Sequence, residues 1–343
     1  MAANLASILI IVLIIMAISL AFSIGANDET LSALAGAAVI KFKIALLLGG
    51  IAIGGGMIFF SGGFVAKTVG KDILGEGITY STFILLSVLI SSIIWLVIGS
   101  FAGIPLSSTH ALIGSVVGVV IIYALFQGGI DLNTAFNWQK LGNVILSWFI
   151  SPLLGLLITY IVFKTLVKLY LKRLRGLNQI EKSEKYFKWI LLSAVLFAEI
   201  SVGANSGEAL GILFGLYSNG SIDFSQYFFF VIICGIFAFL GIYIAARYVI
   251  KNLASQMTDA RPSESLIIQM SSALILFIAT IFGVPISHSH VIVFCIVGLN
   301  LSQKKEIDYK NLGKMGVYWV LTFPIAAILA GILYLGFTYF GFY

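Results

Sequence analysis

Long apolar runs without charged residues are the feature that most constrains how this 343-residue chain can fold. They recur from end to end, for example over residues 5–22, 83–101 and 227–245. A run of this length can cross a bilayer as a helix, and lipid offers no partner to unpaired backbone groups, so only helices or closed barrels span it. The runs are continuous and do not alternate, which favours helices. With 60% hydrophobic and 10% charged residues and a mean hydropathy of +1.09, the sequence predicts an all-α polytopic membrane protein.

Positive charges lie in the segments that connect the apolar runs. The formal net charge of +6 would suggest a nucleic-acid partner in a soluble protein. Here Lys and Arg flank apolar spans, so we interpret them as topology signals and contacts to membrane lipid, and we expect no nucleic acid. Cys234 and Cys295 fall within apolar spans, and no disulfide is expected. The run at residues 5–22 lacks the flanks of a signal peptide, which indicates a retained span.

Two unlike motifs each occur twice, in the same order. GAND at residues 25–28 recurs as GANS at 203–206, and GIPLSSTH at 103–110 recurs as GVPISHSH at 283–290. The copies are offset by 178 and 180 residues, which indicates an internal duplication. We therefore predict a first transmembrane repeat over residues 1–171, a charged cytoplasmic linker over 172–188 and a second transmembrane repeat over 189–343.

Corresponding loops of the two halves carry different charge. Lys41 and Lys43 follow the first motif, whereas residues 218–225 hold no Lys or Arg; residues 127–142 hold one Lys, whereas residues 301–314 hold four. Corresponding loops would then face opposite sides, as in an inverted-topology repeat. A cytoplasmic linker would place both termini outside. Residues 63–77 and 245–264 do not fit this pattern, because both loops are basic.

Acidic residues and histidines concentrate near the motifs. Asp28 and Glu29 are adjacent, and Glu199 and Glu208 flank the second copy. Ionisable groups at membrane depth are costly and usually functional, although each of these could instead lie at an interfacial loop end. His110, His288 and His290, the only histidines, fall inside the second motif pair; they could pack or form a site.

The second motif predicts the start of a helix. Proline suits a first helical turn, and Ser or Thr can cap it. If such starts lie at mid-membrane, their free N–H groups and dipoles bind anions without arginine, and inverted repeats would bring two of them together. Ser and Thr could instead bridge packed helices. Asn27 and Asp28 offer oxygen ligands for Na⁺, or a carboxylate that carries a proton. No thiolate, HExxH or nucleotide-binding motif is present.

These motifs resemble those of the PiT family of inorganic phosphate transporters, over nearly the whole chain. The resemblance implies two inverted-topology repeats with broken or re-entrant helices, which import phosphate across the cytoplasmic membrane with Na⁺ or H⁺ by alternating access, without a cofactor. A homodimer is left open. The implied phosphate-binding residues are Ser107, Ser108, Thr109, Ser287, His288, Ser289, Asn27 and Asn205. The implied cation-binding residues are Asn27, Asp28, Asn205, Ser206 and Glu208.

The chain also departs from the family pattern. The usual GANDVAN reads GANDETL here, and the second copy has Ser206 in place of aspartate. A glutamate common about thirty residues further on would fall near Gly55 and Ile233 and is absent. Alternatives are a sulfate or other oxyanion permease, a passive channel, or an intramembrane serine hydrolase that uses Ser206 with His288 or His290. Hydrogen phosphate can donate a proton to a carboxylate and sulfate cannot, which favours phosphate.

Overall fold

The structure, a computed structural model, describes residues 2–37, 39–61, 64–75, 78, 81–102, 104, 106–126, 131–218, 220–251 and 260–341. The side chains of residues 2–6, 36 and 208 lie outside this description. The first half contains α1 (Ala2–Ala26), α2 (Ser32–Gly36), α3 (Phe42–Phe59), α4 (Phe64–Lys67), a π-helical turn (Thr68–Asp72), α5 (Thr82–Ala102), α6 (Ser108–Phe126), α7 (Leu132–Ala135) and α8 (Trp138–Leu169). After a 3₁₀ turn (Leu171–Arg173) follow α9 (Leu177–Asn205), α10 (Gly207–Ser218), α11 (Phe224–Ile244), α13 (Pro262–Ile281), α14 (His288–Gln303) and α15 (Tyr309–Tyr339).

The all-helical, membrane-spanning architecture is confirmed. Nine of the described helices are long and apolar enough to cross a membrane, and the described residues contain no β-strand. Within the predicted loop 63–77, however, α4 and the π-helical turn are helical. Residues 177–188 of the predicted linker form the first turns of α9.

The helices of the two halves pack on one another in a matching pattern. Helix α1 packs on α11 as α9 packs on α3, and α15 packs on α6 as α8 packs on α14. The glycines of the first motif make two of these contacts close. A Cβ on Gly25 would lie 2.1 Å from the carbonyl oxygen of Ala238 in α11, and one on Gly203 would lie 2.0 Å from that of Ile53 in α3. Only glycine allows such an approach.

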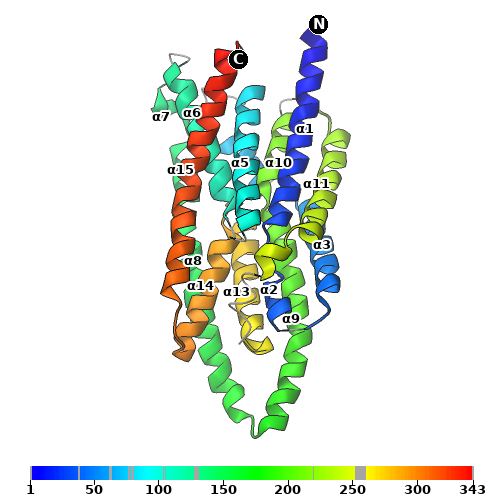
Figure 1. Ribbon diagram of the computed structural model, residues 1–343, viewed down its shortest axis with the longest axis vertical. Helices are drawn as coiled ribbons and strands as arrows, with labels where there is room; N and C mark the ends of the chain where they lie inside the picture. Colours follow the sequence, from blue (N-terminus) through cyan, green and yellow to red (C-terminus); the bar gives the residue numbers. More distant parts are fainter. Residues whose placement is uncertain are drawn as a thin grey trace.

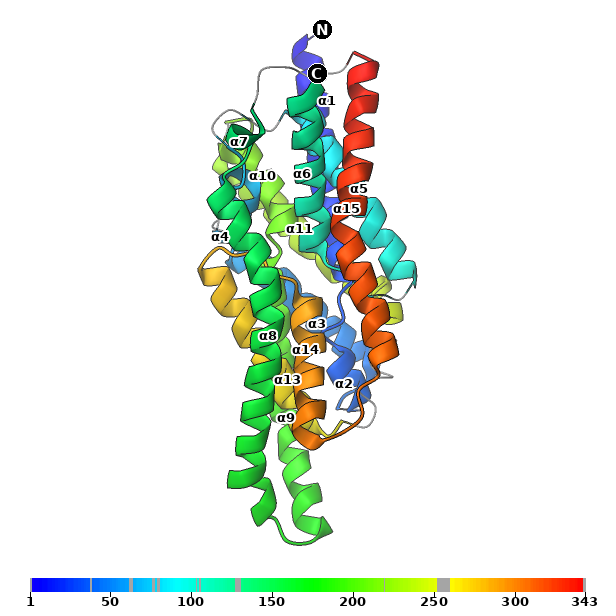
Figure 2. The ribbon, with the colours of Figure 1, turned by 90° about the vertical axis from the view of Figure 1, so that its left-hand side faces the viewer.

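Four shorter or broken elements meet near the middle of the molecule. Helix α1 descends from one end and α9 rises from the other, and each stops at mid-height (Figure 1). Helices α6 and α14 begin at mid-height and run in opposite directions (Figure 2). The beginning of α1 and the end of α15 share one end of the molecule, whereas the α8–α9 turn lies at the other (Figures 1 and 2).

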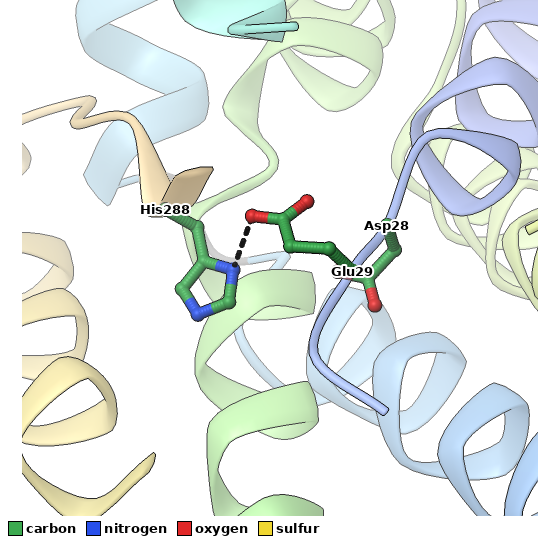
Figure 3. Close-up of side chains that lie close together, drawn as sticks. All are labelled: Asp28, Glu29 and His288. Carbon is green, nitrogen blue, oxygen red and sulfur yellow. Dashed lines mark ion pairs between the residues drawn. The ribbon is translucent and has the colours of Figure 1, made fainter. Parts of the chain in front are cut away.

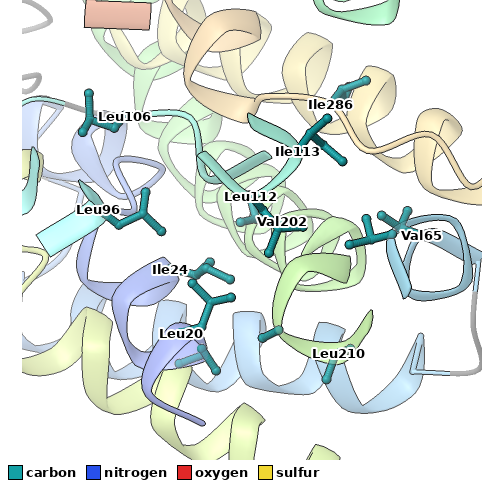
Figure 4. Close-up of a cluster of buried hydrophobic side chains, with 14 of the residues drawn as sticks. Leu20, Ile24, Val65, Leu96, Leu106, Leu112, Ile113, Val202, Leu210 and Ile286 are labelled. Atoms are coloured by element: carbon teal, nitrogen blue, oxygen red, sulfur yellow. The ribbon is translucent and has the colours of Figure 1, made fainter. Parts of the chain in front are cut away.

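Buried aliphatic side chains from both halves surround this meeting point. Figure 4 shows Leu20 and Ile24 of α1 near Val202 of α9, together with Leu112 of α6 and Ile286 before α14. An apolar surrounding strengthens every electrostatic interaction at the centre and raises the cost of an unpaired polar group there.

Candidate functional site

The two copies of the first motif lie where the long helices break. Helix α1 ends at Ala26 and α2 begins at Ser32. Helix α9 ends at Asn205, and a single residue separates it from the start of α10 at Gly207. The asparagine of each copy is buried. Its amide therefore needs hydrogen-bond partners inside the protein.

Each asparagine binds the backbone segment that precedes one of the two helices, α6 or α14, that begin at mid-height. Asn27 Nδ2 donates to the Leu106 carbonyl at 2.7 Å, and the Leu106 N–H lies 3.5 Å from Asn27 Oδ1. In the second half Asn205 Nδ2 donates to the Val284 carbonyl at 3.3 Å, and the Ile286 N–H donates to Asn205 Oδ1 at 3.2 Å. These side-chain amides, predicted as ligands, are thus engaged with backbone, and they position the starts of α6 and α14.

The second motif begins two helices, as its sequence predicts. Ser107 Oγ accepts from the His110 N–H at 3.1 Å, and Ser287 Oγ accepts from the His290 N–H at 3.4 Å. Each cap therefore satisfies one of the N–H groups that the first turn of a helix leaves without a partner inside the helix. Pro285 precedes the cap by two residues and so lies before the first turn, contrary to our expectation. Gly103 and Pro105 lie outside the described residues.

A small cavity separates the two helix starts. It has a volume of about 40 Å³, and we call it the serine cavity because Ser107, Ser108, Ser287 and Ser289 line it. Asn27 and His288 also line it, whereas Thr109 and Asn205 do not. Thr109 Oγ1 instead donates to the Ile286 carbonyl at 3.4 Å, across the two halves. The volume is about that of one water molecule, so phosphate would need the lining to move apart.

Carboxylates face the same cavity. Glu29 Oε1 lies 3.3 Å from His288 Nδ1, an ion pair that joins the break after α1 to the first residue of α14 (Figure 3). Asp28 accepts from both the N–H and the hydroxyl of Thr30, each at 2.9 Å. One ligand atom from each of Asp28, Glu29 and His288 fits within 4.8 Å, so these residues could hold a cation.

A third carboxylate joins this cluster from the second half. Glu199 in α9 is fully buried and interacts with Asp28 and, more weakly, with Glu29. No Lys or Arg is buried in the described part of the chain. Three buried carboxyl groups therefore gather around a single basic partner, His288, and a bound cation or protons would offset the charge that these carboxyl groups carry. Sequence reasoning noted Glu199 but omitted it from the site, and its position in an apolar helix was the available signal.

The remaining predicted cation ligands do not join the carboxylates in the described structure. Ser206 Oγ donates to the Val202 carbonyl of its own helix at 2.7 Å. No hydrogen bond links Ser206 to His288 or His290 in the described part, so the catalytic pair of a hydrolase is not formed there. The side chain of Glu208 lies outside the described residues.

Comparison with known proteins identifies the relatives of this arrangement. The chain is 28% identical to the "Probable low-affinity inorganic phosphate transporter" of Bacillus subtilis, over 95% of this chain and 96% of that protein. It is 27% identical to the protein of the same name from Rhizobium meliloti, over 80% of each. A solved structure described as "The sodium-dependent phosphate transporter" superposes with a TM-score of 0.84 at 21% identity, covering 96% of this chain and 99% of that one. Residues 24–330 match the phosphate transporter family, and the chain belongs to that family.

Proposed function

We propose that this protein imports inorganic phosphate across the cytoplasmic membrane. The observation that carries the proposal is the meeting of two capped helix starts, α6 and α14, around the serine cavity. Backbone N–H groups and hydroxyls at such starts suit a tetrahedral oxyanion. The family and the names of the relatives support phosphate as that anion. A family of transporters gives no support to the hydrolase alternative.

We further propose that Na⁺ or H⁺ moves with the anion. Asp28 and Glu29 line the serine cavity and Glu199 interacts with both of them, and the described residues offer no buried Lys or Arg beside His288 to balance these carboxyl groups. Phosphate brings further negative charge to this place, and a cation bound by the carboxylates would offset the repulsion. The solved relative is described as sodium-dependent, which favours Na⁺.

Transport would proceed by alternating access between two inverted repeats, residues 1–171 and 189–343, joined by the linker 172–188. The opposite directions of α1 and α9, and of α6 and α14, support this proposal (Figures 1 and 2). The basic α8–α9 turn would face the cytoplasm, which places both termini outside.

Uptake of radiolabelled phosphate into proteoliposomes tests the function. We expect uptake driven by an inward Na⁺ or H⁺ gradient, and its loss in Asp28→Asn. Asp131→Asn is the matched control, because Asp131 is an exposed cap of α7, which lies near one end of the molecule and away from the site at mid-height (Figure 1). It should transport like the wild type.

Two results would contradict the proposal. Sulfate uptake without phosphate uptake would show a different oxyanion permease. Phosphate flux that ignores both cation gradients would show a passive pathway.

A further inference from the structure

A larger cavity lies apart from the serine cavity, between α6, α8, α14 and α15. Its volume is about 500 Å³, within the range of pockets that hold small organic ligands. Both halves contribute to its walls, through His110, Trp148, Phe149, His290, Trp319 and Val320 among others. We call it the lateral cavity. None of its lining residues is Asp, Glu, Lys or Arg, so the cavity offers no fixed positive charge and is unsuitable for phosphate.

Polar atoms without partners lie in the wall of this cavity. Both ring nitrogens of His110, Nε2 of His290 and Nε1 of Trp148 are buried and have no hydrogen-bond partner among the described residues. The two histidine rings meet edge to face with their centroids 4.6 Å apart, and His110 meets Trp148 edge to face with a centroid distance of 3.9 Å. Buried groups of this kind are normally satisfied by protein, water or ligand. Their gathering in one cavity indicates a ligand that hydrogen-bonds.

The lateral cavity opens towards the hydrocarbon of the bilayer. Phe149 in α8 and Val320 in α15 line it and are largely exposed. Both helices are long enough to cross a membrane, and these residues belong to their apolar stretches. The phase in contact with the opening is therefore lipid, and a ligand would enter from there.

We propose that the lateral cavity binds an uncharged single-chain lipid that carries one hydroxyl group. The chain lies along the apolar walls, and the hydroxyl reaches the imidazoles and the indole N–H once the side chains that cover these buried nitrogens turn aside. A hydroxyl both donates and accepts, and so complements neutral imidazoles and the donor of Trp148. A plain hydrocarbon would leave these polar atoms unpaired, and a charged head group would lack an opposite charge.

This ligand would contact the first turns of both α6 and α14, on a side away from the serine cavity. His110 and His290 belong to the first turns of α6 and α14, whose caps Ser107 and Ser287 line the serine cavity. Occupancy should therefore favour the present arrangement of the two helix starts. The lipid site does not depend on which anion is transported.

Tryptophan fluorescence can detect the lipid directly. A variant with Trp95, Trp138 and Trp189 changed to Phe keeps only the two indoles that line the lateral cavity. We expect a long-chain alcohol brominated at mid-chain to quench them saturably in nanodiscs. A bromoalkane of equal length should need about tenfold higher concentration, because one buried hydrogen bond contributes about that factor.

Gly316→Phe supplies the control for site occupancy. Gly316 lines the cavity, and a Cβ there meets no heavy atom within 4 Å, so the ring can fill the space without displacing backbone. Saturable quenching should disappear. If the triple Trp variant does not fold, native mass spectrometry of the otherwise wild-type protein with the alcohol, with and without Gly316→Phe, gives the same comparison.

Three outcomes would overturn the proposal. Equal affinity for the alcohol and the alkane would mean that the polar atoms take no part. Quenching unchanged by Gly316→Phe would place the probe in bulk lipid. Absence of saturable binding, or quenching that falls as the protein dimerises, would mean that water or a second copy occupies the cavity.

Discussion

The ion pair between Glu29 and His288 predicts that the loss of His288 destabilises the protein more than the loss of Glu29. When both groups are ionised, their separation of 3.3 Å gives an attraction of about 5 kcal/mol at an effective dielectric constant of about 20. Much of this offsets desolvation, so the pair itself adds little. Removal of one partner is different, because it leaves the other charge buried and uncompensated, at a cost of about 3–5 kcal/mol.

His288→Asn should be the damaging change, since His288 is the basic member of a cluster that also holds Asp28 and Glu29. It leaves the carboxylates of that cluster unbalanced. With about 2 °C per kcal/mol for a chain of this size, the unfolding temperature should fall by about 6–10 °C. Glu29→Gln removes one carboxylate and leaves His288 beside Asp28, so its effect should stay below about 1.5 kcal/mol.

The double variant Glu29→Gln/His288→Asn decides between a charge effect and a packing effect. It should be more stable than His288→Asn alone, because the unbalanced Glu29 charge is gone. Thermal unfolding of purified protein in detergent measures all three variants, and Glu306→Gln, an exposed glutamate, should change stability by less than about 0.5 kcal/mol. A double variant less stable than His288→Asn would refute the reasoning, as would Glu29→Gln as the more damaging single change.

Two further predictions concern the first motif. Gly25→Ala and Gly203→Ala should each destabilise the protein by at least about 1–3 kcal/mol, because the added methyl meets a neighbouring helix backbone at about 2 Å. Gly55→Ala, with nothing within 4 Å of its Cβ, should be neutral or stabilising in the same unfolding assay. Asp28→Asn should abolish the phosphate uptake that a cation gradient drives, whereas Ser206→Ala should keep most of it, since only Asp28 belongs to the carboxylate cluster. Equal loss in the two variants would contradict this asymmetry.

The sequence was informative wherever the signal is local. The Ser-rich motifs predicted helix starts, because serine caps act on the few residues next to them. Ser107 and Ser287 do cap the predicted helices. Length and hydropathy sufficed for the membrane-spanning architecture, since lipid leaves few alternatives to helices.

Contacts between distant segments could not be predicted in the same way. Glu29 and His288 are 259 positions apart, and their pairing depends on how the two halves dock. Glu199 resembled an interfacial residue because one glutamate in an apolar run does not reveal its neighbours. Asn27 and Asn205 were predicted as ligands because an amide oxygen can bind a cation or a backbone N–H equally well. Only the fold supplied Leu106 and Ile286 as their partners.

The two halves thus agree in the hydrogen bonds of their asparagines and differ in the number of their carboxylates. The hydrogen bonds of Asn27 and Asn205 to the segments before α6 and α14 occur in both halves, so the backbone that presents the helix starts is held twice. Charge is distributed unequally: Asp28 and Glu29 have no acidic counterparts at Ser206 and Gly207. Two matched helix starts can share one anion between them, and a shared anion needs only one adjacent cation. Repulsion among a second set of buried carboxylates would raise the cost of the site without a gain in anion binding. Serine in place of aspartate in the second copy is therefore compatible with the anion site that we propose, and the carboxyl groups of the proposed cation site are Asp28, Glu29 and Glu199.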